Sequence, residues 1–129
     1  MNIEGSSLSH IKNDQMERFI EVCLLVLLKE QPGYGYGLID ELAGFGFDPA
    51  QLNVSTLYRS LRKMEKEKLV TSKWESGGQG PRRRVYEITD QGVEDLHEWI
   101  QILKKRKKRI EQLIIRFDQL ESEEGKNEG

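Results

Sequence analysis

Three consecutive arginines, Arg82, Arg83 and Arg84, stand in the stretch GPRRRVYEIT, just before a run of alternating residues. Guanidinium groups bind phosphate through paired hydrogen bonds, and an arginine on a loop can enter a narrow minor groove of DNA. The alternative is an edge strand protected from aggregation by charge, a task for which one charge is enough. Three in series favour a polyanionic partner, and we expect them at the tip of a β-hairpin.

A second group of polar and cationic side chains lies on one face of the helix expected over residues 54–68. Its members are Ser55, Arg59, Arg62, Lys63 and Lys66. Arginine can bond guanine edges, and serine and lysine can hold bases or phosphates. The alternative is an ordinary solvated face. Because this helix and the three arginines belong to one basic section of the chain, together they predict contact with double-stranded DNA.

The charge of the chain is unevenly distributed. The net charge is −2, but residues 1–50 carry −5, residues 51–89 carry +5 and residues 90–129 carry −2. Attraction to phosphate is local, because salt screens it within about 8 Å. The asymmetry is therefore more informative than the total.

The elements that must position these groups follow from hydrophobic periodicity and from breaker residues. Expected in order are helices over 16–31, 36–46 and 54–68, strands over 69–75 and 83–89, and a long helix over 90–121. Asn53 is the expected N-cap of the third helix, and Gly44 or Gly46 ends the second. The predicted fold class is mainly α with a small β-hairpin, which is a winged helix-turn-helix followed by a long helix.

This pattern divides the chain into four parts. They are a flexible N-terminus (1–15), the winged helix-turn-helix domain (16–89), a dimerisation helix (90–121) and a disordered acidic tail (122–129). Two sets of residues are expected to cover the core: Val54, Leu57, Leu61 and Met64 from the third helix, and Val70, Trp74, Tyr86 and Ile88 from the hairpin.

An apolar seam with a heptad repeat runs along the last helix. It consists of Val93, Leu96, Ile100, Leu103, Lys107, Ile110, Ile114 and Phe117. Such a seam favours a homodimer, in which Lys107 would set the register, and Phe19 of the first helix joins the expected interface. The helix could instead pack back onto the first helix. The basic run over residues 104–109 surrounds the helix and is interpreted as its solvated flank.

Four segments, GYGYGLIDEL, STLYRSLRKMEKEKLV, SKWE and GPRRRVYEITDQG, give residues 18–100 a resemblance to the PadR family of bacterial transcriptional regulators. The resemblance implies a dimeric winged-helix protein that binds DNA, commonly a repressor released from its operator by a ligand or a stress signal. A regulator without a ligand, whose abundance alone sets repression, also fits the sequence.

The resemblance also implies roles for individual residues. Tyr36 corresponds to a tyrosine that touches the DNA backbone, and Ser55, Thr56 and Tyr58 correspond to the opening of the recognition helix. Arg59 and Arg62 follow on its polar face, and residues 82–84 correspond to the basic wing. Tyr34 stands where the family often has histidine. Because some members bind flat aromatic molecules between their last helices, Trp99 is a candidate effector contact; plain interface packing is the alternative.

Other classes of protein find little support. His10 and His97 are isolated, so no metal site is expected, and no nucleophile stands beside a base. The apolar run of residues 22–28 is shorter than the ~20 residues of a membrane helix. Cys23 within it is interpreted as a reduced core residue of a cytoplasmic protein. We therefore expect no enzyme, no cofactor and no membrane partner. The remaining alternative is a protein-interaction module that pairs through its last helix without binding specific DNA.

Overall fold

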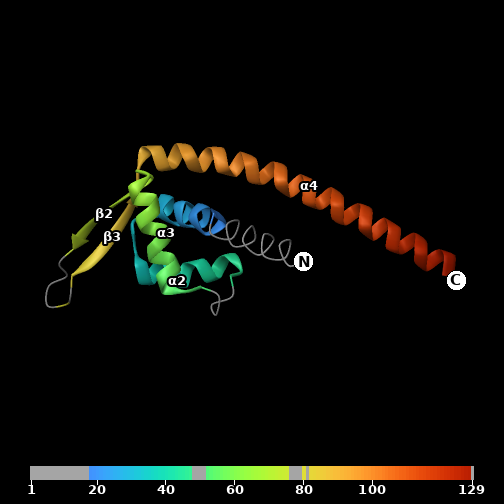
Figure 1. Ribbon diagram of the computed structural model, residues 1–129, viewed down its shortest axis with the longest axis horizontal. Helices are drawn as coiled ribbons and strands as arrows, with labels where there is room; N and C mark the ends of the chain where they lie inside the picture. The colour runs from blue at the N-terminus through green and yellow to red at the C-terminus, as the bar shows by residue number, and fades with distance from the viewer. Residues whose placement is uncertain (1–17, 48–51, 76–79, 81, 129) are drawn as a thin grey trace, which may run out of the picture. The chain divides into compact units, whose positions relative to one another are not determined.

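The computed structural model describes residues 18–47, 52–75, 80 and 82–128 (Figure 1). The predictions for residues 1–15 and for the loop between the two expected strands lie largely outside these ranges. Within them the chain is mainly helical with a small antiparallel sheet, which confirms the expected fold class. Its elements, in order, are a helix over residues 18–30, β1 (Gly33–Tyr34), α2 (Gly35–Leu42), η1 (Ala43–Phe45), α3 (Val54–Lys66), β2 (Val70–Glu75), β3 (Arg83–Ile88) and α4 (Asp90–Glu128).

The helix boundaries follow local rules that the sequence contains. Gly46 has a φ of 91°, a left-handed conformation that favours glycine, and it ends η1 directly after α2. Asn53 caps α3, because its Oδ1 accepts a hydrogen bond from the amide of Ser55 at 2.8 Å. Both expectations are confirmed. The third helix ends at Lys66, slightly before the expected residue 68, and Lys68 has a φ of 66°.

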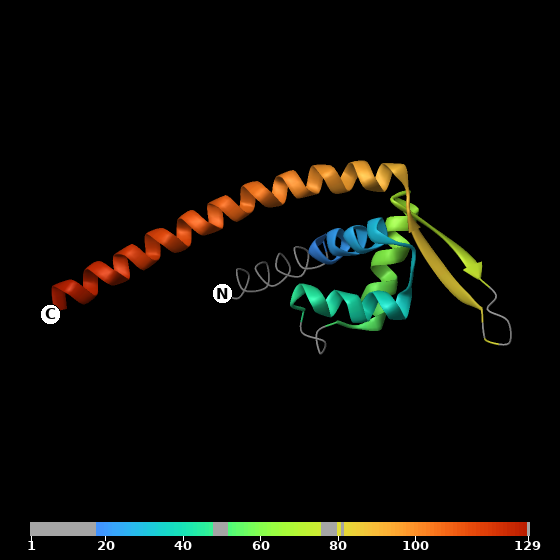
Figure 2. The same ribbon diagram turned by 180° about the vertical axis from the view of Figure 1, so that it is seen from behind.

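The sheet has three strands in the order β1-β3-β2, all antiparallel, and the hairpin of β2 and β3 projects beyond the helices (Figures 1 and 2). Trp74 is paired with Arg84 and Ser72 with Tyr86, so these four side chains share one face. The two-residue strand β1 was not expected. It pairs Gly33 with Tyr86 and thereby attaches the start of α2 to the hairpin.

The core lies between the first helix, α2, α3 and the base of the hairpin. Its most deeply buried large side chains are Leu24, Leu25, Leu42, Leu61, Met64, Val70 and Tyr86. Two expectations for the core were wrong: Val54 is 44% exposed, and Trp74 is 58% exposed. Val54 is the first residue of α3, and Trp74 stands near the outer end of β2, so both lie beyond the packed layer.

The chain forms two compact units, and the boundary between them falls within the long helix α4. The first unit ends at Leu96, and the second begins at His97. Residues 90–96 therefore lie in the same compact unit as the winged elements, and Leu96 is only 5% exposed. The helix continues to Glu128 instead of ending near residue 121. No proline interrupts residues 121–128, and glutamate and lysine favour helix, so the expected disordered tail is helical over that range.

Thr89 connects β3 to α4. Its hydroxyl donates to the carbonyl oxygen of Lys68 at 2.7 Å, and its Oγ1 accepts from the amide of Gly92 at 3.0 Å, which caps the first turn of the helix. A Cβ atom on Gly92 would overlap the carbonyl oxygen of Leu69, so only glycine fits there. In the described part of the chain, no helix is both long and apolar enough to cross a membrane.

Candidate nucleic-acid interface

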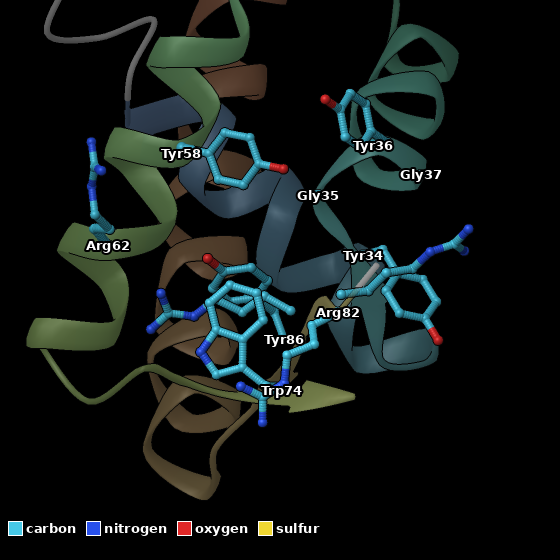
Figure 3. A pocket seen from close by; sticks show the side chains of 11 residues that line it. Tyr34, Gly35, Tyr36, Gly37, Tyr58, Arg62, Trp74, Arg82 and Tyr86 are labelled. Atoms are coloured by element: carbon cyan, nitrogen blue, oxygen red, sulfur yellow. The ribbon is translucent and has the colours of Figure 1, made fainter. Parts of the chain in front are cut away.

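A hollow of about 870 Å³ opens between the start of α2, the helix α3 and the hairpin (Figure 3). Its lining consists of aromatic rings, glycines and arginines: Tyr34, Gly35, Tyr36, Gly37, Tyr58, Arg62, Trp74, Arg82, Arg83, Arg84 and Tyr86. Arg62, one member of the polar group that the sequence singled out on α3, and the three arginines of the hairpin therefore meet in one concave surface. We call it the basic hollow.

The α3 side of the basic hollow is formed by Tyr58 and Arg62, which stand one helical turn apart (Figure 3). Arg62 is exposed and Tyr58 is half-buried. A Cβ atom on Gly35 would approach Cζ of Tyr58 to 2.7 Å, so the missing side chain of Gly35 allows α2 to approach this ring closely. The close approach brings the start of α2 and α3 together at the hollow.

The other predicted residues of α3 lie outside the lining of the basic hollow. Ser55 and Arg59 are exposed, and Arg59 Nη2 donates to Oγ1 of Thr56 at 3.3 Å. This bond fixes the arginine along the first turns of the helix. Lys66, near the end of α3, is also exposed.

Lys63 is held by the first helix rather than presented to the hollow. Its Nζ lies 3.0 Å from Oε1 of Glu21. Burial raises the pKa of the Glu21 carboxyl in spite of this partner, and the hydrogen bond to Glu21 raises the pKa of Lys63. Because its charge is already paired, Lys63 is less suited to a DNA contact than its position on the polar face indicated.

The three arginines of the hairpin differ in their surroundings. Arg82 and Arg83 are exposed, whereas Arg84 is half-buried. The guanidinium carbon of Arg83 lies 5.7 Å from the centroid of the Tyr34 ring, a distance typical of a cation–π contact. Arg82, which precedes β3, is therefore the arginine best placed to extend toward a partner.

Arg84 contacts four side chains of its own chain. Its Nε donates to Oγ of Ser72 at 2.8 Å, and its Nη2 lies 3.2 Å from Oε2 of Glu65. Its guanidinium carbon also stands 5.6 Å from the centroid of Trp74 and 5.9 Å from that of Tyr86. The sequence grouped Arg84 with the DNA contacts, but these bonds direct it toward α3 and β2.

Two tyrosines from the junction of β1 and α2 complete the basic hollow. Tyr36 is 74% exposed and offers its hydroxyl to solvent, as a backbone contact requires. The Tyr34 hydroxyl donates to Oε2 of Glu75 at 2.6 Å, and this hydrogen bond raises the pKa of Tyr34. Tyr34 thus connects β1 to the outer part of β2. Sequence reasoning noted Tyr34 only as a departure from a family pattern and placed Trp74 in the core, so it missed both as parts of the hollow.

The unit that begins at His97 carries an apolar stripe along α4. The exposed large side chains on this part of the helix include Ile110, Leu113, Ile114, Phe117 and Leu120. Their spacing of three and four residues aligns them on one face. Leu113 is 70% exposed, so nothing in the described chain covers the centre of the stripe.

Other predicted residues of α4 lie in different surroundings. Val93, Trp99, Ile100 and Leu103 are half-buried, and residues 104–109 are exposed. Lys107 pairs at 4.0 Å with Glu111, four residues further along the helix. Phe19, the remaining member of the predicted interface, contacts the ring of Phe47, with 5.6 Å between the centroids. Among the described residues, no group of histidine, cysteine or acidic side chains could hold a metal ion.

Comparison with known families and structures places the chain among transcriptional regulators. Residues 24–98 match the family model described as the transcriptional regulator PadR-like family. This range contains the whole of the basic hollow and ends in the first turns of α4. It does not include the apolar stripe.

Three solved structures illustrate the similarity. A PadR-like regulator from Bacillus cereus is 32% identical, with a TM-score of 0.66 over 78% of this chain and 96% of that one. A PadR family regulator from Eggerthella lenta is 28% identical, with a TM-score of 0.65 over 87% and 96% of the two chains. Bacillus subtilis PadR in complex with operator DNA is 24% identical, with a TM-score of 0.57 over 64% and 47%, and shares the fold.

Proposed function

The chain belongs to the PadR-like family of transcriptional regulators, and from that premise we propose that it is a dimeric repressor that binds operator DNA through the basic hollow. The observation that carries the proposal is that Arg62 of α3 and the arginines of the hairpin line one concave surface. A shared surface allows both elements to bind the same segment of duplex. The proposal is supported by Bacillus subtilis PadR, which shares the fold and whose structure is in complex with operator DNA.

In this proposal α3 enters the major groove, and the hairpin follows the adjacent backbone or minor groove. Arg62 can donate two hydrogen bonds to a guanine edge. Tyr36, at the start of α2, is placed to contact a phosphate, and Arg82 extends the cationic surface along the duplex. Ser55, Thr56 and Arg59, at the beginning of α3, are the further residues that we assign to DNA contact.

The apolar stripe of α4 supports the dimer. Exposed side chains at heptad-like spacing are buried most simply against the same stripe of a second copy, and two copies present two recognition helices. On an operator with two-fold symmetry, such helices occupy half-sites separated by about 34–36 Å or a multiple of it. Two contacts on one DNA molecule then raise the affinity of the pair above that of either copy.

Repression and its release are the regulatory part of the proposal. A dimer seated on an operator excludes the transcription machinery, and a ligand or stress signal that favours another arrangement of the dimer releases it. Trp99 is half-buried just where the second unit begins, and it is our candidate for the effector contact. A repressor of this kind acts where the chromosome is, in the bacterial cytoplasm.

The proposal is tested by selecting bound fragments from random duplex DNA and then measuring affinity by gel retardation. We expect a two-fold-symmetric site and an affinity that falls steeply with salt. Arg62→Ala should weaken binding to the selected site by about 10- to 100-fold, since an arginine–guanine pair contributes about 1–3 kcal/mol. Lys29→Ala, an exposed cation on the first helix outside the basic hollow, is the matched control and should bind as the wild type does.

Loss of wing arginines should act differently from loss of Arg62. Arg82→Gln should reduce the slope of log affinity against log salt by about one contact, with little change in base preference. Weak binding of the wild type that does not depend on salt would reject the proposal. Together with a different protein that co-purifies through α4, that result would favour the interaction module instead.

A further inference from the structure

Three side chains from three elements form a closed set of hydrogen bonds at the joint between α3 and the hairpin. Ser72 Oγ of β2 donates to Oε1 of Glu65 at 2.5 Å, Arg84 Nη2 of β3 donates to Oε2 of the same carboxylate at 3.2 Å, and Arg84 Nε donates to Ser72 Oγ at 2.8 Å. We call Glu65, Ser72 and Arg84 the brace. Each member bonds to the other two.

The position of the brace requires an explanation, because Glu65 places a negative charge on a helix that is proposed to approach phosphates. Arg84 belongs to the basic hollow, and Glu65 neutralises it. If attraction to DNA were the only requirement, this pairing would lower the affinity. The side chains of Arg84 and Glu65 are 39% and 29% exposed, so the pair is partly withdrawn from water. Each oxygen of the Glu65 carboxylate accepts a hydrogen bond from a different strand of the hairpin.

We propose that Glu65 is a positioning residue for DNA binding, which fixes the hairpin relative to α3 through Ser72 and Arg84. This inference rests on the proposed function. In it, Arg84 serves as the fixed point of the hairpin and contacts Glu65 instead of a phosphate, while Arg62 and Arg82 make the contacts with DNA. The brace sets the distance and angle between those two contacts before the duplex arrives.

The chain connection shows why a side-chain joint is useful here. Only residues 67–69 connect α3 to β2, and Lys68 among them has a left-handed backbone conformation. The brace adds a second, side-chain joint between α3 and the middle of the hairpin. Ordering such an element during binding costs conformational entropy, and a pre-ordered hairpin avoids that loss.

Removal of the Glu65 charge should change the affinity for DNA in the direction opposite to the one that electrostatics alone predicts. Glu65→Gln removes a negative charge beside the DNA surface, so charge alone predicts tighter binding. The brace predicts weaker binding, by about 3- to 10-fold, because the hairpin loses its fixed position. Glu67→Gln removes the same charge from an exposed residue outside the brace, and this matched control should bind as tightly as the wild type or more tightly.

The experiment measures the affinity of the full-length protein for its selected operator, at a temperature where unfolding experiments show every variant to be folded. Ser72→Ala opens the brace without altering charge; it should also weaken binding several-fold while leaving the salt slope unchanged. A double-mutant cycle then tests positioning directly. Arg82→Ala should weaken binding less in the Glu65→Gln protein than in the wild type, because a hairpin out of position already loses that contact.

Equal or tighter binding by Glu65→Gln, or full additivity with Arg82→Ala, would overturn the inference while leaving the proposed function intact. A wild-type protein that binds no duplex DNA would overturn the proposed function, and the inference with it. A purely structural role for Glu65 would lower stability but would leave both the affinity of the folded protein and the double-mutant cycle unchanged.

Discussion

The basic hollow and the apolar stripe of α4 are both exposed surfaces, but their side chains are held in opposite ways. In the hollow, Arg83 lies over Tyr34, and Arg84 is bonded to Glu65 and Ser72. Along the stripe, Leu113 and Phe117 project from a single helix with no described neighbour to cover them. Contacts within the chain hold the side chains of the hollow in place. The side chains of the stripe are aligned by their spacing along the helix, but no described residue holds them in place.

The difference indicates what each surface requires from its partner. A pre-arranged polar surface selects a partner of matching geometry, since little reorganisation is needed when the partner binds. For an exposed apolar stripe, the favourable free energy of association comes from the removal of apolar area from water. Any partner with a complementary apolar stripe can supply that gain. A second copy of the same chain is the simplest such partner, which is why we assign specificity to the hollow and assembly to the stripe.

The largest effect is expected from a charge placed in the apolar stripe, which tests whether the stripe is the assembly surface. Ile114→Asp should convert the dimer to monomers at micromolar concentration, because the carboxylate would be buried unpaired in the interface. Operator affinity should then fall by at least about 100-fold through loss of bivalent binding. Sedimentation velocity and gel retardation measure the two effects.

The matched control for this change is Gln112→Asp, which places the same charge on an exposed residue two positions away and off the stripe. It should remain dimeric and bind DNA normally. If Ile114→Asp remained a dimer, the stripe would not be the assembly surface.

Two glycines of α4 sharpen the contrast between the packed and the open part of that helix. Gly92→Ala should destabilise the protein by about 1–3 kcal/mol, because the new methyl group would meet the Leu69 carbonyl and the Ile88 side chain. Gly125→Ala meets nothing within 4 Å and should stabilise its helix by up to about 1 kcal/mol. Urea unfolding followed by circular dichroism compares them, and equal effects would contradict the packing described for Gly92.

The smallest effect is expected for Lys63, which does not line the basic hollow. Lys63→Met should reduce stability by less than about 1 kcal/mol at neutral pH, since the pair with Glu21 is half exposed on the lysine side. Its effect on the salt slope of DNA binding should be negligible. A slope reduced as much as in Arg82→Gln would show that Lys63 contacts phosphate after all.

The stability that Lys63→Met loses relative to the wild type should depend on pH. The pair exists only when Glu21 is charged and Lys63 is protonated. The pKa of Glu21 is raised, so the contribution of the pair is lost as pH falls through that raised value. The pKa of Lys63 is also raised, so the contribution is lost again as pH rises through it. Unfolding free energies of the variant and the wild type should therefore converge at both extremes.

The sequence alone predicted the structure correctly where the local structure depends on one short segment. Asn53 and Gly46 were identified from their own conformational preferences and their immediate neighbours. The face of α3 that contains Leu61 and Met64 followed from helical periodicity. The hairpin arginines and Arg62 were also identified as one basic section, and the structure brings them to one hollow.

The sequence was insufficient where a partner comes from a distant element. The strand β1 has only two residues, and its pairing depends on Tyr86, far along the chain. Lys63 and Arg84 looked like DNA contacts because their carboxylate partners, Glu21 and Glu65, belong to other elements. Charge patterns show where cations stand along the chain but not which of them are already paired.

The single residue between β3 and α4 has a mechanical consequence. Thr89 is bonded on one side to the turn after α3 and on the other to the first turn of α4, and Gly92 packs against the same turn. Hydrogen bonds and close packing therefore join the first turn of α4 to the end of β3 and to the turn after α3. Thr89 is the one residue between that turn and the strand of Arg83 and Arg84, so a substitution that reshapes the start of α4 acts first on the base of the hairpin.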